Sequence, residues 1–402
     1  MLQNKVPNVR FSKYLGIWKT TKLNRITEII GGGTPDTKQS SYWNGGINWF
    51  SPTEVGKTVY LTKSEKTISQ LGLQKSSAKL LPAFKTILFT SRAGIGDVGI
   101  LTEESATNQG FQSLVVNGET DVYFLYSYSD QIKKYALKHS AGSTFLEISG
   151  KELGKMDLSI PSLPEQKAIG SLFRTLDDLL ASYKDNLANY QSLKATMLSK
   201  MFPKAGQTVP EIRLDGFEDE WEKLKLRDIV HTNPKSELPE NFKYIDLESV
   251  VGTRINKVRE ERKGSAPSRA QRLAKKGDVF YQTVRPYQKN NYLFKLDEID
   301  YVFSTGYAQL RPIFKRCDSD FLLILLQNNR FLSKVLDRCT GTSYPAINVN
   351  DLIEILIAIP SYDEQRAIGS YFSNLDNLIN SYQEKISQLE TLKKKLLQDM
   401  FI

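Results

Sequence analysis

The chain has 402 residues, of which 40% are hydrophobic and 25% are charged, and its 54 Lys and Arg against 45 Asp and Glu give a formal net charge of +9. These values fit a folded protein of two or three domains, and the surplus of positive charge permits a polyanionic partner. With two Cys, two His and no apolar run near the roughly 18 residues of a membrane span, a disulfide framework, a His/Cys metal site and a membrane protein are excluded.

The N-terminal eleven residues, MLQNKVPNVRF, lack the apolar core of a signal peptide, so we expect a cytoplasmic protein. A lead-in segment at 6–26 recurs at 209–229 with an offset of 203, and the two copies share Val, Pro, Arg, Trp, Lys and Leu at matching places. The polar stretch with Pro and Gly before the second copy is typical of a linker.

The region after the first lead-in is predicted to mix strands and helices. Strands are expected at 87–93, 98–101 and 111–117, and a helix is expected at 121–138. A Gly-rich, aromatic loop at 31–55 is followed by the amide, hydroxyl and basic residues that contact bases and phosphates in nucleic-acid complexes. The candidate nucleic-acid contacts here are Lys75, Ser76, Ser77, Lys79, Arg92, Asn108, Gln109 and Gln112.

Two patterns in this region imitate nucleotide-binding motifs. The glycines of 94–99 spell G-x-G-x-x-G after a strand, but the following residues favour another strand rather than the required helix, so a tight hairpin is predicted. Residues 56–58 resemble the end of a P-loop, but Ser51 stands where that loop needs Gly. Because no Asp/Asn-Pro-Pro motif and no Ser/His/Asp or Cys/His set stands out either, we expect no catalytic residue and no metal ligand in this chain.

A long helix is predicted after each variable region. Residues 161–202 and 360–401 align without gaps at an offset of 199, and 19 of the 42 positions are identical. In the first copy Ser162 and Glu165 fit the S-x-x-E capping box, and the second copy keeps both residue types. The chain therefore contains two repeats, and each repeat has a lead-in, a variable region and a long helix.

The second variable region is predicted to contain strands at 278–285 and 300–312 and a helix at 318–338. Its basic run between 251 and 280 suits a phosphate-lined groove, although most charge runs are simply solvated. Residue types that read base edges and stack on bases lie nearby. The candidate nucleic-acid contacts are Arg254, Lys257, Arg269, Gln271, Arg272, Arg285, Tyr287, Gln288, Asn290 and Asn291.

Apolar residues recur every seven positions along both long helices, which is a coiled-coil pattern. These residues form a wide apolar stripe along each helix, which one helix cannot bury alone. We therefore expect an antiparallel coiled coil of two helices, each roughly 57 Å long. A generic dimerisation coil is the alternative. The positions expected to form the coil and to dock partners are Ile169, Leu172, Leu176, Leu179, Tyr183, Ile368, Tyr371, Leu375, Leu378 and Tyr382.

The expected fold class is therefore α+β, with two mixed globular domains joined by the coiled coil and related by a pseudo-two-fold internal repeat. The expected boundaries are 1–160 for the first recognition domain, 161–202 for the first helix, 203–359 for the linker and the second recognition domain, and 360–402 for the second helix.

The repeated EQ-x-AIGS-x-F-x-x-LD and terminal MF segments, with the VP-x-x-R…W lead-ins, resemble the specificity subunit of type I restriction-modification systems over essentially the whole chain. SSAKLLPAFKTILFTSRAGIGDVG and SRAQRLAKKGDVFYQTVRP also resemble segments of the target recognition domains of that family.

This resemblance implies that two target recognition domains each read one half of a bipartite, asymmetric sequence in double-stranded DNA. It implies that the coiled coil sets the spacer and docks two modification subunits, which bind S-adenosylmethionine and methylate adenine, and that restriction subunits use ATP and Mg²⁺. No cofactor is then expected on this chain. From the residues alone, a coiled-coil adaptor that binds proteins rather than DNA stays open, and a self-contained nuclease or methyltransferase is disfavoured by the missing motifs.

Overall fold

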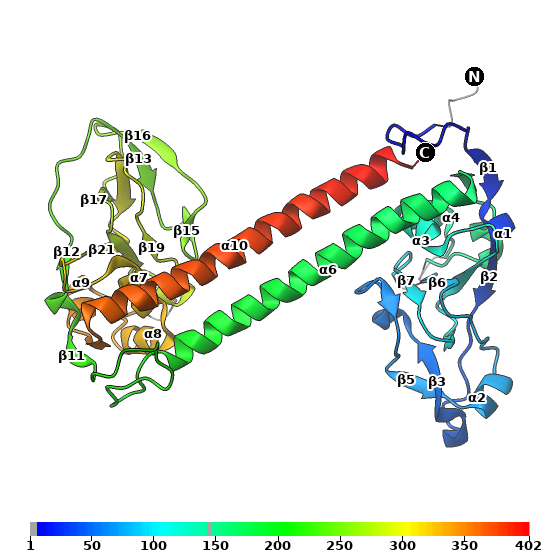
Figure 1. Cartoon of the computed structure of the whole chain (residues 1–402), viewed down its shortest axis with the longest axis horizontal. Coiled ribbons are helices and arrows are strands. Elements are labelled where there is room, and N and C mark those ends of the chain that lie inside the picture. The colour runs from blue at the N-terminus through cyan, green and yellow to red at the C-terminus, as the bar shows by residue number, and fades with distance from the viewer. Residues whose placement is uncertain (1–5, 93, 143–145, 342, 402) are drawn as a thin grey trace. The chain divides into compact units, whose positions relative to one another are not determined.

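The computed structural model describes residues 6–92, 94–142, 146–341 and 343–401. The chain forms two compact units. Unit 1 contains the residues up to Lys184 and those from Glu384 onward, and unit 2 spans Asp185–Gln383. Figure 1 labels many of their elements. Within the described ranges, no helix combines the length and the apolar character that crossing a membrane requires.

Unit 1 contains a five-stranded sheet in the order β2-β9-β6-β7-β4, a three-stranded sheet in the order β5-β3-β8, and the antiparallel pair β1-β10. Its strands are β1 (Lys19–Lys22), β2 (Thr27–Gly31), β3 (Trp43–Phe50), β4 (Tyr60–Leu61), β5 (Lys66–Ile68), β6 (Thr86–Phe89), β7 (Val98–Leu101), β8 (Ser105–Thr107), β9 (Gln112–Val116) and β10 (Asp157–Ile160). Its short helices are α1 (Leu23–Ile26), α2 (Gln70–Gln74), α3 (Val122–Ser127), α4 (Ser129–His139) and α5 (Gly150–Leu153).

Unit 2 contains two four-stranded sheets, in the orders β12-β21-β18-β19 and β16-β13-β20-β17, and the pairs β11-β22 and β14-β15. Its strands are β11 (Glu222–Lys225), β12 (Val230–Thr232), β13 (Asn241–Ile245), β14 (Val250–Val251), β15 (Arg254–Ile255), β16 (Arg259–Arg262), β17 (Ala270–Leu273), β18 (Val279–Gln282), β19 (Tyr292–Leu293), β20 (Tyr301–Ser304), β21 (Tyr307–Pro312) and β22 (Leu356–Ile359). Its short helices are α7 (Ser319–Gln327), α8 (Asn329–Leu336) and α9 (Val349–Ile353).

The two variable regions share a central strand order although their sequences and strand numbers differ. Strand β6 lies between β9 and β7 in unit 1, just as β18 lies between β21 and β19 in unit 2. The parallel pair β3-β8 has its counterpart in the parallel pair β13-β20. Strand pairing needs only a compatible pattern of burial, so the framework can persist while residue identities change. The internal repeat therefore extends through the variable regions.

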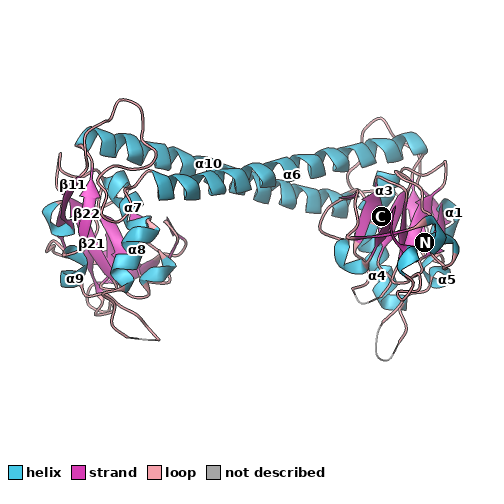
Figure 2. Ribbon diagram, turned by 90° about the horizontal axis from the view of Figure 1, so that it is seen from below, coloured by secondary structure: helices cyan, strands magenta, loops and turns pink. Residues whose placement is uncertain are grey.

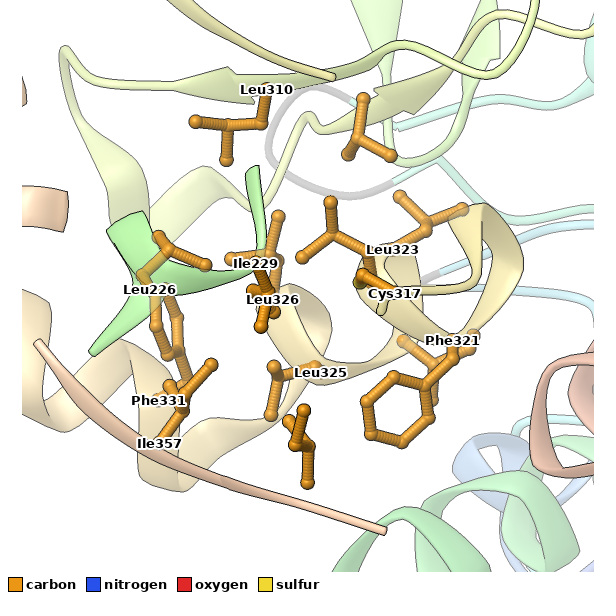
Figure 3. Close-up of a cluster of buried hydrophobic side chains, with 14 of the residues drawn as sticks. Leu226, Ile229, Leu310, Cys317, Phe321, Leu323, Leu325, Leu326, Phe331 and Ile357 are labelled. Atoms are coloured by element: carbon orange, nitrogen blue, oxygen red, sulfur yellow. The ribbon is translucent and has the colours of Figure 1, made fainter. Parts of the chain in front are cut away.

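Each unit buries the Met-Phe pair that follows one of the long helices among aromatic side chains. In unit 1, Phe401 lies 4.6 Å from Tyr128 and 5.7 Å from Phe173, measured between ring centroids. In unit 2, Phe202 stacks on Phe321 at 5.9 Å. Figure 3 shows part of the unit 2 core, where α7 is buried on all sides, as expected of a helix that is apolar all round.

The long helices are α6 (Leu163–Lys200) and α10 (Tyr362–Asp399), drawn in cyan in Figure 2. Each contributes its first half to one unit and its second half to the other. The predicted capping boxes are only partly present, because the carboxylates of Glu165 and Glu364 bind arginines of the lead-ins instead of the helix start. Only the second copy keeps a side-chain cap, in which Ser361 Oγ accepts from Glu364 N at 3.4 Å.

The Gln that follows each of these glutamates joins the long helix to its variable region. Gln166 Oε1 accepts from Asp121 N at 3.0 Å, and its Nε2 donates to Pro161 O at 3.0 Å. Gln365 makes the same two bonds to Asp318 N and Pro360 O, both at 3.0 Å. Both Asp121 and Asp318 cap the next helix, so the repeated Gln sets where α3 and α7 begin.

The halves of α6 and α10 that share a unit run antiparallel. In unit 1, Asp177 pairs with Lys393 and Lys184 with Glu390, so positions rise on one helix as they fall on the other. In unit 2, Lys194 pairs with Asp376, and the rings of Tyr190 and Tyr382 lie 5.5 Å apart. The expected α+β class, with two mixed domains and an antiparallel helix pair, is therefore confirmed.

The expected apolar positions of the coil are buried in part. Ile169, Leu176, Ile368 and Leu375 are buried as expected, but Leu378 is 42% exposed, and Leu172, Leu179, Tyr183, Tyr371 and Tyr382 are half-buried. The next residue along is buried instead, as with Phe173, Leu180, Phe372 and Ile379. The long helices also pack against the α3 and α7 regions. Their buried residues therefore face these regions as well as the other long helix.

Most predicted elements of the variable regions are confirmed, with shorter strands. Residue 93, at the end of one predicted strand, lies outside the described residues. The predicted hairpin over 94–99 is the antiparallel pair β6-β7. Each predicted helix is broken in two. Helix α7 ends where Asn328 adopts an extended backbone, and the Asn328 side chain then caps α8 by accepting from Arg330 N at 2.8 Å.

Candidate nucleic-acid interface

A strained loop follows strand β18 in unit 2. Arg285 and Lys289 both have a φ of 54°, in the left-handed region, on either side of a single 3-10 turn. For residues with a side chain, such a backbone conformation costs on the order of 1–3 kcal/mol and persists only where the surroundings enforce it. Backbone strain of this kind gathers at functional sites, so this loop is a candidate binding element.

Arg285 is held against an exposed aromatic ring. Its guanidinium lies 4.4 Å from the ring centroid of Tyr344, and its backbone N–H donates to Pro345 O at 2.7 Å. Tyr344 is 64% exposed, so one face of this cation–π pair is open to solvent. Arginine and tyrosine in such an arrangement can stack on bases and donate to their edges.

A pocket of about 330 Å³ lies beside this pair, and Gln282, Gln288 and Asn290 line it. Gln288 Oε1 accepts from Gln282 Nε2 at 2.8 Å, and Asn290 Oδ1 accepts from Gly252 N at 2.9 Å. These bonds use the amide oxygens of Gln288 and Asn290, whose NH₂ groups have no partner among the described residues. The loop therefore places an arginine and two amide donors around the same pocket.

The basic run at 254–276 is only partly available to phosphates. Ion pairs engage Arg259 with Asp246, Arg262 with Glu240 and Lys276 with Asp297. Arg254, Lys257 and Arg269 are exposed and make no ion pair with any described residue. Arg272 is half-buried, and burial lowers the pKa of its guanidinium. Gln271 is exposed and donates from Nε2 to Ser268 O at 2.7 Å.

A buried ion pair supports the strand that leads to the loop. Asp278 is fully buried and accepts from Arg311 Nε at 2.7 Å and from Arg311 Nη2 at 2.8 Å. Its carboxylate also accepts from Gln309 Nε2 at 2.7 Å and from Lys275 N at 2.8 Å. The hydrogen bond to Asp278 raises the pKa of Arg311. These bonds fix the turn before β18. Strand β18 ends at Gln282 and leads into the loop that contains Arg285.

Unit 1 gathers its candidate residues around the Gly-rich loop. Gly33 N donates to Thr107 O at 2.8 Å, and a Cβ on Gly33 would lie 2.2 Å from Ser77 Oγ. The hydroxyl of Thr34 donates to Gln109 Oε1 at 2.5 Å. The close approach that glycine permits therefore brings Ser77 and Gln109 to one surface.

The other unit 1 candidates lie around or near this loop. Lys75 and Lys79 flank Ser77 and are exposed, and Gln112 pairs with Gly31 across the sheet. Arg92 is half-buried and follows Ser91, whose N–H donates to Gly110 O at 2.8 Å.

Three candidate residues accept hydrogen bonds from the backbone of their own unit. Asn291 is 1% exposed, and its Oδ1 accepts from Gln282 N at 2.9 Å, so its placement at the interface is wrong. Ser76 Oγ accepts from Ala78 N at 3.3 Å, and Asn108 Oδ1 accepts from Gly110 N at 2.8 Å. Both are turn residues that shape the loop. Tyr287 remains 49% exposed.

Sequence reasoning missed Tyr344 and Gln282. Tyr344 is 59 positions from Arg285 in the sequence, and no local pattern links the two. Gln282 is a polar residue in a strand that is buried along its length, which is an unusual place for an amide. A glutamine in such an apolar strand could have indicated a functional residue. Across the described ranges, no group of three or more His, Cys, Asp and Glu side chains gathers that could hold a metal ion.

Comparisons with known proteins agree on one family. A family model described as "Type I restriction modification DNA specificity domain" matches residues 17–189 and 218–391. The MjaIX specificity subunit of Methanocaldococcus jannaschii is 26% identical over 94% of this chain and 91% of its own length. The EcoR124I/EcoR124II specificity subunit of Escherichia coli is 29% identical over 42% of this chain and 43% of its own.

Solved structures share the fold. The crystal structure of the S subunit of a type I restriction-modification system from M. genitalium aligns over 99% of both chains with a TM-score of 0.62 and 16% identity. A chain from a structural study of the assembly and conformational transition of the type I R-M system aligns over 96% of this chain and 98% of its own, with a TM-score of 0.52 and 17% identity.

Proposed function

The chain belongs to the family of type I restriction-modification DNA specificity domains, and we propose that its two units read the two unlike halves of one bipartite DNA sequence. It is a DNA-recognition subunit and not an enzyme. The observation that supports the bipartite site is the pairing of one strand order with two different loops. Unit 1 contains the Gly-rich loop with its hydroxyls and amides, whereas unit 2 contains the strained loop after β18, in which Arg285 lies against Tyr344.

Within this proposal, side chains divide into base-reading and phosphate-binding groups. In unit 2, Arg285, Gln288 and Asn290 offer donors to base edges, and an arginine that binds guanine is worth about 1–3 kcal/mol of discrimination. The exposed residues Arg254, Lys257 and Arg269 contact phosphates, which position the protein without reading sequence. In unit 1, Ser77 and Gln109 take the reading role, with Lys75 and Lys79 beside them.

We further propose that modification subunits dock on apolar residues of the long helices. In unit 1, Leu392 of α10 is 45% exposed, and Leu172 and Leu179 of α6 are half-buried. In unit 2, the equivalent residue Leu193 of α6 is 36% exposed, Leu378 of α10 is 42% exposed, and Tyr371 is half-buried. Because the repeat supplies this surface twice, two modification subunits bind one chain.

The remaining partners and cofactors follow from the same proposal. Restriction subunits join the complex that the modification subunits form. The partner subunits bind S-adenosylmethionine, ATP and Mg²⁺. This chain binds none of them at the Gly-rich loop of unit 1 or at the strained loop of unit 2. The protein acts in the cytoplasm, together with the DNA that it recognises.

Selection from randomised DNA tests the bipartite site. The chain is co-expressed with a modification subunit, the complex is incubated with a pool of random duplexes at fixed salt, and the bound fraction is sequenced. The expected result is two fixed segments separated by a spacer of constant length and no sequence preference. One contiguous motif would contradict the proposal. Recovery of no motif at all would favour an adaptor that binds proteins instead of DNA.

A further inference from the structure

Unit 2 contains a second pocket, of about 520 Å³, whose lining shares no residue with the pocket beside the strained loop at 285–289, which we call the reading loop of unit 2. It lies where the linker after α6 crosses β11, α8 and β22, and we call it the linker pocket. Leu325, Phe331 and Ile357 form its apolar wall, and Lys223, Arg330 and Lys334 stand around it. Pockets of this size with an apolar wall and a few polar groups are typical of small-molecule sites.

The three cations of the linker pocket have no carboxylate partner. Lys223 Nζ donates to Gly206 O at 2.9 Å, Lys334 Nζ donates to Leu356 O at 2.7 Å, and Arg330 Nη1 donates to Phe202 O at 2.5 Å. All three acceptors are neutral backbone carbonyls. No described Asp or Glu lies within 4.0 Å of any of these cations, so the pocket carries an unbalanced positive charge.

Other cations in the same part of unit 2 are balanced. Lys225, two residues after Lys223 on β11, pairs with Glu354, and Lys204 at the mouth of the pocket pairs with Glu211. Burial lowers the pKa of Lys334, and the neighbouring charges of Arg338 and Lys223 lower it further. Lys334 is exposed, so an anion can reach its ammonium from solvent.

The internal repeat shows that the fold does not require these cations. In unit 1, the strand pairing Thr20↔Ser159 corresponds to Lys223↔Ala358, which places Thr20 at the position of Lys223. On α4, the buried Ile132 and Ala136 correspond to the buried Phe331 and Val335 of α8. This alignment places Gln131 and Tyr135 at the positions of Arg330 and Lys334. Unit 1 thus keeps buried apolar residues at the two packing positions and has uncharged residues at the positions of Lys223, Arg330 and Lys334.

We propose that the linker pocket binds an organic phosphate, with its phosphate groups at Lys223, Arg330 and Lys334 and an apolar ring against Leu325 and Phe331. The guanidinium of Arg330 has a planar donor fork that matches phosphate oxygens, and the two lysines add point charges. The apolar wall favours a ligand with a ring over a bare inorganic anion. This site belongs to unit 2 alone and is separate from DNA reading.

Calorimetric titration of the full-length chain tests the site, with ADP, adenosine and inorganic pyrophosphate as probes in buffer without Mg²⁺. We expect ADP to bind and to bind more tightly than either of the other two. Arg330→Gln and Lys334→Gln are each expected to weaken ADP binding about tenfold, since each removes a charge-assisted hydrogen bond. Lys138→Gln, an exposed charge on α4 of unit 1, is the control and leaves ADP binding unchanged.

Two further variants guard against effects on folding. Lys223→Gln removes a charge from an exposed position on a two-stranded ribbon, and Ser333→Trp fills the pocket while keeping all three cations. Both are expected to weaken ADP binding while the thermal unfolding midpoint stays at that of the parent. Absence of ADP binding, equal binding of adenosine or pyrophosphate, or indifference to these variants overturns the proposal. Displacement of ADP by duplex DNA overturns it too, because the pocket would then be part of the DNA path.

Discussion

Arg10 and Glu165 lie 155 residues apart in the sequence and are joined by two hydrogen bonds, from Nε to Oε1 at 2.6 Å and from Nη2 to Oε2 at 2.7 Å. The second unit repeats the pair, because Arg213 makes the same two bonds to Glu364 at 2.8 and 2.7 Å. In unit 1, Trp18 Nε1 also donates to Glu165 at 3.3 Å. The lead-in and the helix start are therefore repeated together because they bind each other.

Removal of Arg10 is expected to destabilise unit 1 strongly. The side chain of Glu165 is 2% exposed, so Arg10→Ala leaves a buried carboxylate without its cation, at a cost of about 3–5 kcal/mol in the free energy of unfolding. Chemical denaturation followed by circular dichroism measures the loss. Arg25→Ala, an exposed arginine in the same unit, is the control and changes the free energy little. Equal stability of the two variants would refute the role of the pair.

Gly170 is expected to reject even a methyl group. A Cβ at this position would lie 2.3 Å from Asp121 Oδ1, the cap of α3. Alanine favours helices over glycine by about 1 kcal/mol, yet Gly170→Ala is expected to destabilise the protein by about 1–3 kcal/mol through this clash. Gly118→Ala, with nothing within 4 Å of the added Cβ, is the matched control. A gain in stability in Gly170→Ala would show that the helix moves freely away from α3.

Tyr126 is expected to make stability fall at alkaline pH. Burial raises the pKa of its hydroxyl to about 12 from the ordinary value of 10, and the charges of Asp177 and Asp130 act in the same direction. Between pH 10 and 12 the unfolded chain loses this proton while the folded chain keeps it, so stability present below pH 10 is lost as the pH rises towards 12. The loss is on the order of 2–3 kcal/mol.

The variant Tyr126→Phe cannot ionise and should lose less stability over this range. Urea denaturation at pH 9 and pH 11.5 compares it with the parent, and Tyr287→Phe serves as an exposed control. Parallel declines of Tyr126→Phe and the parent would show that Tyr126 does not contribute to the alkaline loss.

Arg285 is expected to control one position of the unit 2 half-site. Arg285→Gln should weaken binding to the cognate duplex by about 1–3 kcal/mol and relax specificity at that position, as loss of an arginine–guanine contact does. Fluorescence anisotropy with single-base variants of the duplex measures both effects. Lys151→Gln, an exposed residue on α5, is the control. A uniform loss over all duplexes would mean that Arg285 binds phosphate instead.

The exposed leucines of the long helices are expected to hold the modification subunits. Leu193→Asp and Leu392→Asp together should abolish co-purification of these subunits, since a charge is placed in an apolar contact. The unfolding midpoint of the chain itself should stay unchanged because both positions are open to solvent. Leu137→Asp, at a leucine of α4 that is 47% exposed, is the matched control. An intact complex after both substitutions would locate the docking surface elsewhere.

The sequence predicted the parts of the fold that repeat, and the structure supplies the reasons for the repetition. The lead-in and helix motifs align without gaps, so their existence was visible, but the bonds from Arg10 to Glu165 and from Gln166 to Asp121 cross long stretches of chain and leave no local pattern. The heptad pattern predicted the helix pair. Ile169 and Leu176 are buried as predicted, whereas packing against α3 buries Phe173 more deeply than Leu172.

The reading loops were predictable by residue type and not by geometry. Arginine, glutamine and asparagine after β18 suggested base contacts, and Arg285 and Asn290 do line one pocket. The left-handed backbone at Arg285 and its stacking on Tyr344 follow from tertiary packing and could not be predicted. The burial of Asn291 has the same origin, because its Oδ1 accepts from Gln282 N at the end of the strand that leads to the loop.

The central claim, that each unit reads one half-site, is tested most directly by sequencing methyladenine across the genome of cells that co-express this chain with a modification subunit. The parent chain and a variant in which residues 6–160 are replaced by those of a related specificity subunit are compared. The account predicts a bipartite asymmetric motif in which the exchange alters one half and leaves the other half and the spacer unchanged. A change in both halves, or in neither, would contradict it.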